Sequence, residues 1–254
     1  MDAYNILKLA RSSKRPTGKD YIKNTIRNFM EMHGDRRYAD DPAVIGGIGY
    51  LKDLPVTVIA IEKGHSAKER MNRSFGAPKP EGYRKAMRLM KQAEKFGRPV
   101  ICYVDTSGAF CGVGAEKRGQ GQAIAENLME MMTLDTPVIS ILIGEGGSGG
   151  ALALSVADRV WMLENSVYSV ISPEGAASIL WKDSKRADEA AATLKLTAAD
   201  SLENGIIEDI ISEENIGTEE FYKEIQDKLY DEFMGLRDET ELTEKRYARF
   251  RAFR

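Results

Sequence analysis

The chain has 254 residues, of which 43% are hydrophobic and 30% charged, and its formal net charge is −3. This length is sufficient for one substantial core, and the composition and charge exclude a largely disordered chain and a nucleic-acid binder with an overall basic surface. Two cysteines, Cys102 and Cys111, and two histidines are too few for a four-cysteine zinc site or a His-rich metal site, so the sequence predicts no metal ion and no disulfide framework.

The N-terminal region predicts a cytoplasmic protein that begins with a helical segment over residues 1–35. It contains no long apolar segment and no small-residue cleavage site, so we expect no signal peptide, and the apolar runs of the chain are too short to span a bilayer. Residues 20–32, DYIKNTIRNFMEM, predict a helix, and Gly34 is suited to its C-terminal cap. The apolar face of this helix consists of Tyr21, Ile22, Thr25, Ile26, Phe29 and Met30.

A β-hairpin and a basic loop are predicted next. The apolar runs AVIGGIGYL and PVTVIAIEK surround KDL, and Gly46, Gly47 and Gly49 in the first run indicate a bulge or the close approach of another backbone. Residues 64–80 contain charged residues, glycine and proline, which predict a loop. Basic side chains in and around this loop could bind a phosphorylated ligand, or could simply be solvated. They are Lys63, Lys68, Arg70, Arg73, Arg84 and Lys85.

The centre of the chain repeats one unit, which consists of a buried strand, a glycine turn and a helix. RPVICYVDTSGAF precedes the helix RGQGQAIAENLMEMMTLD, and TPVISILIGEGGSGG precedes the short helix ALALSVAD. Residues 81–97 predict a further helix that ends at Gly97. Its inward-facing side chains are Ala86, Leu89, Met90 and Ala93.

Paired short strands with a helix after each turn favour an α/β spiral of strand–strand–helix units over an alternating doubly wound sheet. We expect this core to cover residues 36–212. The tail over residues 213–254 is charged and amphipathic, and it predicts one or two surface or partner-facing helices.

The glycine run from Gly144 to Gly150 has several possible interpretations. It contains five glycines and a G-x-G-x-x-G, and Glu164 follows at the distance expected in a dinucleotide-binding unit. A short following helix and Glu145, whose carboxylate would lie beside a pyrophosphate, oppose that interpretation. A P-loop would need lysine and a hydroxyl residue after the last glycine, where Ala151 stands. A tight turn between closely packed elements remains compatible with the run.

A further interpretation of this run has a chemical consequence. The amides of Gly149 and Gly150 lie where the helix ALALSVAD begins, so they are among the unpaired donors of its first turn. Two such amides can stabilise one oxygen on which negative charge develops. The turn DTSGAFCG after the neighbouring strand could present another amide to the same cavity, which favours a site between the two turns.

Six ordered segments resemble the alpha subunits of bacterial acetyl-CoA carboxylase carboxyltransferase. They are RPTGKDYIKN, HGDRRYADDPAVIGGIGYL, FGAPKPEGYRKAMRLM, DTSGAFCGVGAEKRGQGQAIAENL, IGEGGSGGALAL and YSVISPEGAASILWK. The resemblance implies a crotonase/ClpP-like superhelix of ββα turns with added N- and C-terminal helices, which agrees with the spiral expected from the pattern.

The resemblance also implies an activity. Members of this family move the carboxyl group from carboxybiotin, held on a separate carrier protein, to acetyl-CoA, and so form malonyl-CoA in the first committed step of fatty acid synthesis. The implied partners are a beta subunit in an α2β2 assembly, the biotin carboxyl carrier protein and biotin carboxylase. Two alternatives remain open, namely a self-sufficient crotonase-like acyl-CoA hydratase or isomerase and a non-catalytic nucleotide-binding or scaffold protein.

Site residues follow from the same resemblance. The amides of Gly149 and Gly150 are expected to stabilise the ureido oxygen of biotin. The turn from Ser107 to Cys111 departs from the family, because these two residues replace prolines and Phe110 replaces tyrosine, which loosens the turn. The residues expected on the biotin side are Gly108, Ala109 and Phe110, and those expected to contact coenzyme A or the carrier are Lys63, Lys68, Arg70 and Arg73. The carboxylates expected to orient the loops by accepting backbone amides are Glu145 and Glu174.

Overall fold

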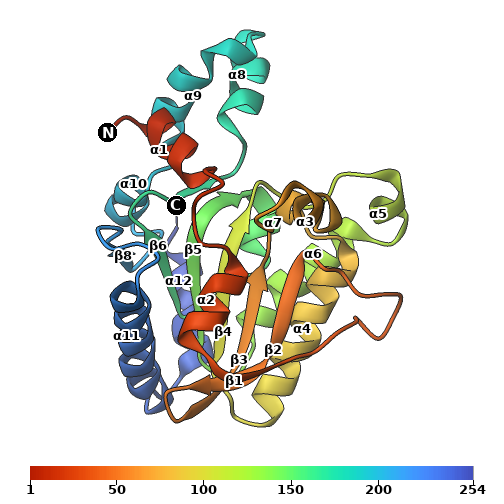
Figure 1. The fold of residues 1–254 in the computed structure, drawn as a ribbon, viewed down its shortest axis with the longest axis vertical. Coiled ribbons are helices and arrows are strands. Elements are labelled where there is room, and N and C mark those ends of the chain that lie inside the picture. Colours follow the sequence, from red (N-terminus) through yellow and green to blue (C-terminus); the bar gives the residue numbers. More distant parts are fainter. Residues whose placement is uncertain (254) are drawn as a thin grey trace.

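The structure is a computed structural model that describes residues 1–253. Within these residues, eight strands form one mixed sheet in the order β1-β2-β3-β4-β5-β6-β8, and β7 pairs with β5 (Figure 1). The strands are β1 (Arg27–Glu31), β2 (Val44–Leu51), β3 (Leu54–Ile61), β4 (Val100–Thr106), β5 (Val138–Gly147), β6 (Arg159–Leu163), β7 (Val167–Ser169) and β8 (Asp209–Ile211).

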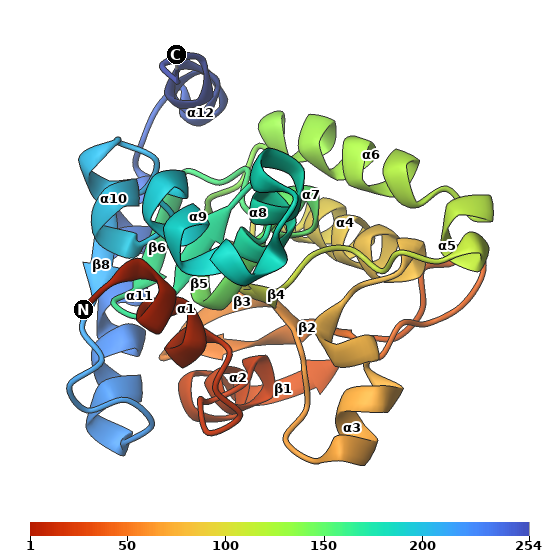
Figure 2. The same cartoon turned by 90° about the horizontal axis from the view of Figure 1, so that it is seen from above.

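Helices cover both faces of the sheet. The helices are α1 (Ala3–Ala10), α2 (Gly18–Thr25), α3 (Ala67–Asn72), α4 (Pro80–Lys95), α5 (Val113–Lys117), α6 (Gln120–Met132), α7 (Ser148–Leu152), α8 (Pro173–Trp181), α9 (Ala187–Leu194), α10 (Ala198–Glu203), α11 (Glu219–Arg237) and α12 (Leu242–Arg251). Helices α2 and α11 pack on one face, and α4, α6 and α7 pack on the other (Figure 2). Because both faces are covered, β4 is buried along its whole length, as is typical of a parallel strand in the middle of a sheet.

The parallel pairing of β4 and β5 brings both glycine turns to one edge of the sheet. Thr106 lies opposite Gly146, so the segments that follow these residues leave the sheet side by side. Beyond this edge, α1, α8 and α9 form a small lobe (Figure 1). The sheet edge at the carboxyl ends of parallel strands is where α/β folds bind their ligands.

The predicted hairpin is confirmed as β2 and β3, and its glycines do allow a close approach. A Cβ atom on Gly47 would lie 2.2 Å from the carbonyl oxygen of Met30 in β1. The helix predicted over residues 20–32 is wrong beyond Thr25, because the chain there becomes β1 and pairs antiparallel with β2. The glycines of β2 leave room for this extra strand, and the pairing outweighs the helical spacing of the apolar residues.

The loop predicted over residues 64–80 contains a short helix, α3. The side chain of Ser66 accepts the backbone amide of Glu69, and the carboxylate of Glu69 accepts the amide of Ser66. This reciprocal capping box is the S-x-x-E signal that could have revealed the helix. The helix predicted over residues 81–97 is confirmed as α4, whose four expected inward side chains are all buried.

The C-terminal tail forms the two helices α11 and α12, and α11 lies on the surface with its apolar face packed against the sheet. It buries apolar side chains against the sheet, including Phe221, Ile225 and Leu229. Helix α12 is attached through the buried side chain of Arg246. None of the helices described for residues 1–253 is long and apolar enough to cross a membrane. The division at residues 35 and 212 stays a prediction.

A buried lysine holds the segment between β1 and β2. Lys85 of α4 is fully buried, and its Nζ donates to Asp40 Oδ1 at 2.5 Å and to the carbonyl oxygen of Asp41 at 2.9 Å. Burial alone would raise the pKa of Asp40. Hydrogen bonds from Lys85, the Gly34 amide and His33 outweigh that effect and hold the pKa well below its usual range.

Asp40→Asn is therefore expected to make the free energy of unfolding depend less on pH in the acid range. A carboxylate with a lowered folded-state pKa contributes stability above its unfolded pKa of about 3.9 and loses it as the pH falls through the folded value. Urea unfolding between about pH 2 and pH 5 measures this. Asp231→Asn, on the exposed side of α11, is the matched control. Parallel profiles for the wild type and Asp40→Asn would contradict the prediction.

Candidate functional site

The two glycine turns lie in direct contact. A Cβ atom on Gly147 would lie 2.2 Å from the carbonyl oxygen of Ser107, and a Cβ atom on Gly150 would lie 2.5 Å from the backbone nitrogen of Ala109. Only glycine fits at these two positions without displacing the neighbouring backbone. The structure thus brings the turn after β4 and the turn after β5 together, as the pairing of neighbouring parallel strands requires.

Two unpaired amides mark the start of α7. Gly149 and Gly150 occupy its first turn, and among the hydrogen bonds of residues 1–253 neither amide has an acceptor. The preceding Ser148 has a φ of 52°, which turns the chain sharply out of β5. The hydroxyl of Tyr83, from α4, donates to the carbonyl oxygen of Gly150 at 3.1 Å and fixes the peptide unit that follows the two donors. Together with the backbone contact between Gly150 and Ala109, this bond constrains the start of α7 before any acceptor binds.

The turn after β4 is held by a threonine. Thr106 Oγ1 accepts the amide of Gly108 at 3.0 Å and donates to the carbonyl oxygen of the same residue at 2.8 Å. The amide of Phe110 donates to the carbonyl oxygen of Pro78 at 2.9 Å. These bonds constrain the turn although Ser107 and Cys111 are exposed and neither supplies the rigidity of a proline. The Gly108 amide is already satisfied, so it is not a further donor for the cavity.

Glu145 and Glu174 do not orient the loops by accepting backbone amides, and that expectation is wrong. Both carboxylates bind the guanidinium of Arg11, from the end of α1. Arg11 Nη2 and Nε donate to Glu145 at 2.6 and 3.1 Å, and Nη1 donates to Glu174 Oε1 at 2.7 Å. Charge-assisted pairs of this kind are the strongest hydrogen bonds in proteins. Arg11 thus ties β5 to α8 beside the glycine run.

Arg11→Ala is expected to lower the free energy of unfolding by about 1–2 kcal/mol, because it leaves the largely buried carboxylate of Glu145 without its cation. Urea unfolding at neutral pH measures the change. Lys14→Ala, an exposed position in the same segment, is the matched control and should leave the midpoint unchanged. Equal midpoints for the two variants would show that the Arg11 bridge does not stabilise the fold.

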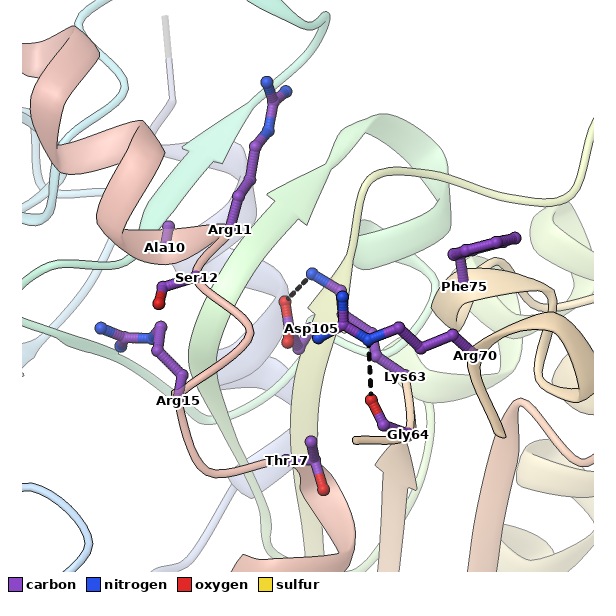
Figure 3. A pocket seen from close by; sticks show the side chains of 10 residues that line it. All are labelled: Ala10, Arg11, Ser12, Arg15, Thr17, Lys63, Gly64, Arg70, Phe75 and Asp105. Atoms are coloured by element: carbon purple, nitrogen blue, oxygen red, sulfur yellow. Dashed lines mark hydrogen bonds and ion pairs between the residues drawn. The ribbon is translucent and has the colours of Figure 1, made fainter. Parts of the chain in front are cut away.

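A small cavity of about 60 Å³ lies between the N-terminal segment and the ends of β3 and β4. Figure 3 shows Lys63 reaching toward Asp105, with a distance of 2.5 Å between Nζ and Oδ1, and Arg70 reaching toward the carbonyl oxygen of Gly64, with Nε at 3.1 Å. Arg15 lies on the opposite side of the cavity (Figure 3). The structure therefore brings together two of the basic residues expected to contact coenzyme A or the carrier.

The other basic residues lie elsewhere. Lys68 is exposed on α3, and Arg73 Nη1 donates to the carbonyl oxygen of Pro42 at 2.5 Å. Arg84 pairs with Asp35, and Lys85 is buried as described above. Lys85 therefore presents no surface to a ligand.

Sequence reasoning missed two residues that fix this region. Arg15 donates bidentately to Glu213, at 2.6 and 2.7 Å, and also contacts the carbonyl oxygen of Ile143 in β5. Asp105 Oδ1 accepts the amide of Glu145 at 2.8 Å in addition to the ammonium of Lys63. The segments RPTGKDYIKN and DTSGAFCG contain Arg15 and Asp105. No local sequence pattern shows which distant side chains these two residues contact.

The comparison with known proteins identifies the family. A model of the family described as acetyl co-enzyme A carboxylase carboxyltransferase-like matches residues 1–254. The chain belongs to this family. A relative from Ruminiclostridium cellulolyticum, named acetyl-coenzyme A carboxylase carboxyl transferase subunit alpha, is 62% identical over 229 residues, which are 90% of this chain and 88% of the relative. The expected resemblance is confirmed.

Two further proteins bear on the partner and the fold. A Clostridium tetani protein, named acetyl-coenzyme A carboxylase carboxyl transferase subunits beta/alpha, is 55% identical and aligns with 99% of this chain and 45% of its own length. A solved Pseudomonas malonate decarboxylase hetero-tetramer in complex with coenzyme A has a TM-score of 0.72 at 16% identity, with 91% of this chain and 92% of that chain covered. The likeness confirms the crotonase-like α/β fold expected for this family.

Proposed function

We propose that this chain is the alpha subunit of an acetyl-CoA carboxyltransferase, which moves the carboxyl group of carboxybiotin to acetyl-CoA and forms malonyl-CoA. One structural observation carries the assignment of the site, namely the pair of amides of Gly149 and Gly150 without acceptors at the start of α7. Within a family of carboxyltransferases, such a pair suits an oxygen that gains negative charge as a carboxyl group leaves.

The two amides suit the ureido carbonyl oxygen of biotin. The ureido ring has a carbonyl oxygen that can accept both donors. Glycine at position 150 lets the two turns pack together, because a Cβ atom there would lie 2.5 Å from the backbone nitrogen of Ala109. Biotin, when bound on its carrier, supplies the carboxyl group and a nitrogen able to take up a proton. The chain's own contribution is to hold two amide donors at the place where charge develops, with Tyr83 fixing the peptide unit that follows them.

The surroundings of the site support a mechanism without a side-chain base from this chain. Cys102 is no candidate base, because it is buried in the core and burial raises its pKa to about 12, so its thiol stays protonated near neutral pH. The carboxylates nearest the glycine run are both occupied, Glu145 by Arg11 and Asp105 by Lys63. A self-sufficient hydratase or isomerase would need a carboxylate poised at the substrate's α-carbon, so these pairs count against that alternative.

The proposed partners are a beta subunit in an α2β2 assembly, the biotin carboxyl carrier protein and biotin carboxylase, in the cytoplasm. The name of the Clostridium tetani relative joins beta and alpha in one chain, which supports the beta subunit. The beta subunit would hold acetyl-CoA, and the glycine turns of this chain would face it across the active site. Lys63 and Arg70 are proposed contacts of coenzyme A or the carrier, because both line the cavity at the same edge of the sheet.

A reconstitution experiment tests this function. The purified chain, alone and with a beta subunit, is supplied with malonyl-CoA and a biotin analogue, and carboxyl transfer is measured. In a parallel assay the chain alone is supplied with an unsaturated acyl-CoA. Transfer only in the mixture supports the proposal, whereas hydration by the chain alone would replace it with the hydratase alternative. No reaction in either assay would favour a non-catalytic protein.

A further inference from the structure

A second cleft, of about 540 Å³, lies between α4, α6 and the segment that joins β1 to β2. None of its lining residues belongs to the two glycine turns. It is lined by Asp35, Arg36, Arg37, Arg84, Met87, Arg88, Lys91, Glu126 and Glu130. Five of these side chains are cationic and three are carboxylates, so the cleft carries excess positive charge although the whole chain is slightly acidic.

Each carboxylate of the cleft already has a cation. Asp35 pairs with Arg84, Glu126 with Arg37 and Glu130 with Lys91, at 2.7, 3.4 and 2.8 Å. The excess charge therefore resides on the two remaining guanidiniums, those of Arg36 and Arg88. Among residues 1–253 neither of them forms an ion pair.

Arg36 and Arg88 converge on one peptide segment. Arg36 Nη1 donates to the carbonyl oxygen of His33 at 2.7 Å, and Arg88 Nη2 reaches the same oxygen at 3.4 Å while its Nε donates to Gly34 at 3.1 Å. Burial and then the positive charge of Arg36 lower the pKa of Arg88, against the opposing charges of Asp40 and Asp35. Two like charges thus lie close together without an anion between them, which costs free energy until one binds.

The arrangement is rigid before any ligand binds. The carboxylate of Asp35, whose side chain is fully buried, accepts the backbone amides of Arg37, Tyr38 and Ala39 at 2.7–3.1 Å. Arg36 has a φ of 65°, a left-handed conformation that non-glycine residues adopt only where the surrounding structure enforces it. The sequence HGDRRYADDP, which by itself indicates only a polar break, therefore builds a fixed turn that presents Arg36.

We propose that this cleft binds the phosphate group of a small phosphate-bearing molecule between Arg36 and Arg88. Guanidinium groups bind phosphate oxygens bidentately, and a phosphate carries about two negative charges and three acceptor oxygens at neutral pH, which matches two adjacent guanidiniums better than one carboxylate does. The volume exceeds that of a bare phosphate and lies in the range of small-molecule sites. The site is independent of the carboxyl transfer proposed above.

Calorimetric titration of the full chain at constant ionic strength tests the proposal, with inorganic phosphate as the probe and malonate as a dicarboxylate of equal charge. Arg36→Gln and Arg88→Gln should each weaken phosphate binding about ten- to a hundredfold. Lys95→Gln, at the exposed end of α4, should bind as the wild type does. Circular dichroism of each variant checks that the fold is retained.

Coenzyme A and its 3′-dephospho form distinguish the source of the phosphate. Tighter binding of coenzyme A than of either inorganic phosphate or the dephospho form assigns the site to a phosphate ester, and equal binding of coenzyme A and inorganic phosphate assigns it to free phosphate. Both results support the proposal if they depend on Arg36 and Arg88. The proposal is overturned if the wild type binds no phosphate, if malonate binds as tightly as phosphate, or if the two arginine variants bind phosphate as tightly as Lys95→Gln.

Discussion

Gly149→Pro is expected to slow carboxyl transfer by about 10²–10³ in a folded complex with the beta subunit, because proline removes one of the two amides that have no acceptor in α7. Both kcat and kcat/KM should decrease, because the amide would stabilise charge that develops only in the transition state. Steady-state kinetics of malonyl-CoA formation at saturating carrier measure both quantities.

Gly149→Ala is the matched control, because it keeps the amide. A Cβ atom at Gly149 would meet only the side chain of Ile124, at 3.6 Å, which is an ordinary contact, so this variant should transfer carboxyl groups nearly as fast as the wild type. Gly150→Ala does not serve as a control, since its Cβ atom would displace the backbone of Ala109. Thermal unfolding of the proline variant checks for strain at Ser148. Equal rates for Gly149→Pro and Gly149→Ala in folded complexes would refute the role of this amide.

The sequence predicted those parts of the fold that local signals specify. Two apolar runs separated by turn residues predicted the hairpin β2–β3. A helical apolar face followed by Gly97 predicted α4. The repeated unit of strand, glycine turn and helix predicted that β4 and β5 are neighbours. Neighbouring parallel strands in turn bring the two glycine turns into contact. The hairpin and α4 depend on residues close together in the chain, and the adjacency of β4 and β5 depends on the repetition of a local pattern.

Features that depend on distant pairing were missed. The residues from Arg27 to Glu31 have a helical apolar spacing, yet they form a strand because β2 offers a partner edge without side chains at Gly47 and Gly49. The bridge from Arg11 to Glu145 joins residues 134 positions apart, and that from Arg15 to Glu213 joins residues 198 positions apart. Periodicity and spacing contain no information about such pairs, so the network around the glycine run emerged only from the structure.

Arg246 illustrates the same limit at the C-terminus, and Arg246→Ala is expected to lower the free energy of unfolding by about 3–5 kcal/mol. Its guanidinium is buried and donates to both carboxylate oxygens of Asp158, at 2.8 and 2.9 Å, and to the carbonyl oxygens of Met131, Leu134 and Thr136. Removing it leaves a carboxylate buried without its cation and detaches α12. Urea unfolding at neutral pH measures the loss.

Comparison with further variants shows why Arg246→Ala lowers the free energy of unfolding. Arg251→Ala, in the exposed last turn of the same helix, should change the free energy of unfolding by no more than about 0.5 kcal/mol. If the cost of Arg246→Ala comes from the isolated charge of Asp158, then Arg246→Met combined with Asp158→Asn should be more stable than Arg246→Met alone, because no buried charge remains. If the double variant is instead less stable than Arg246→Met, Asp158 stabilises the fold through its bond to the Val138 amide, and the ion pair is not what fixes α12.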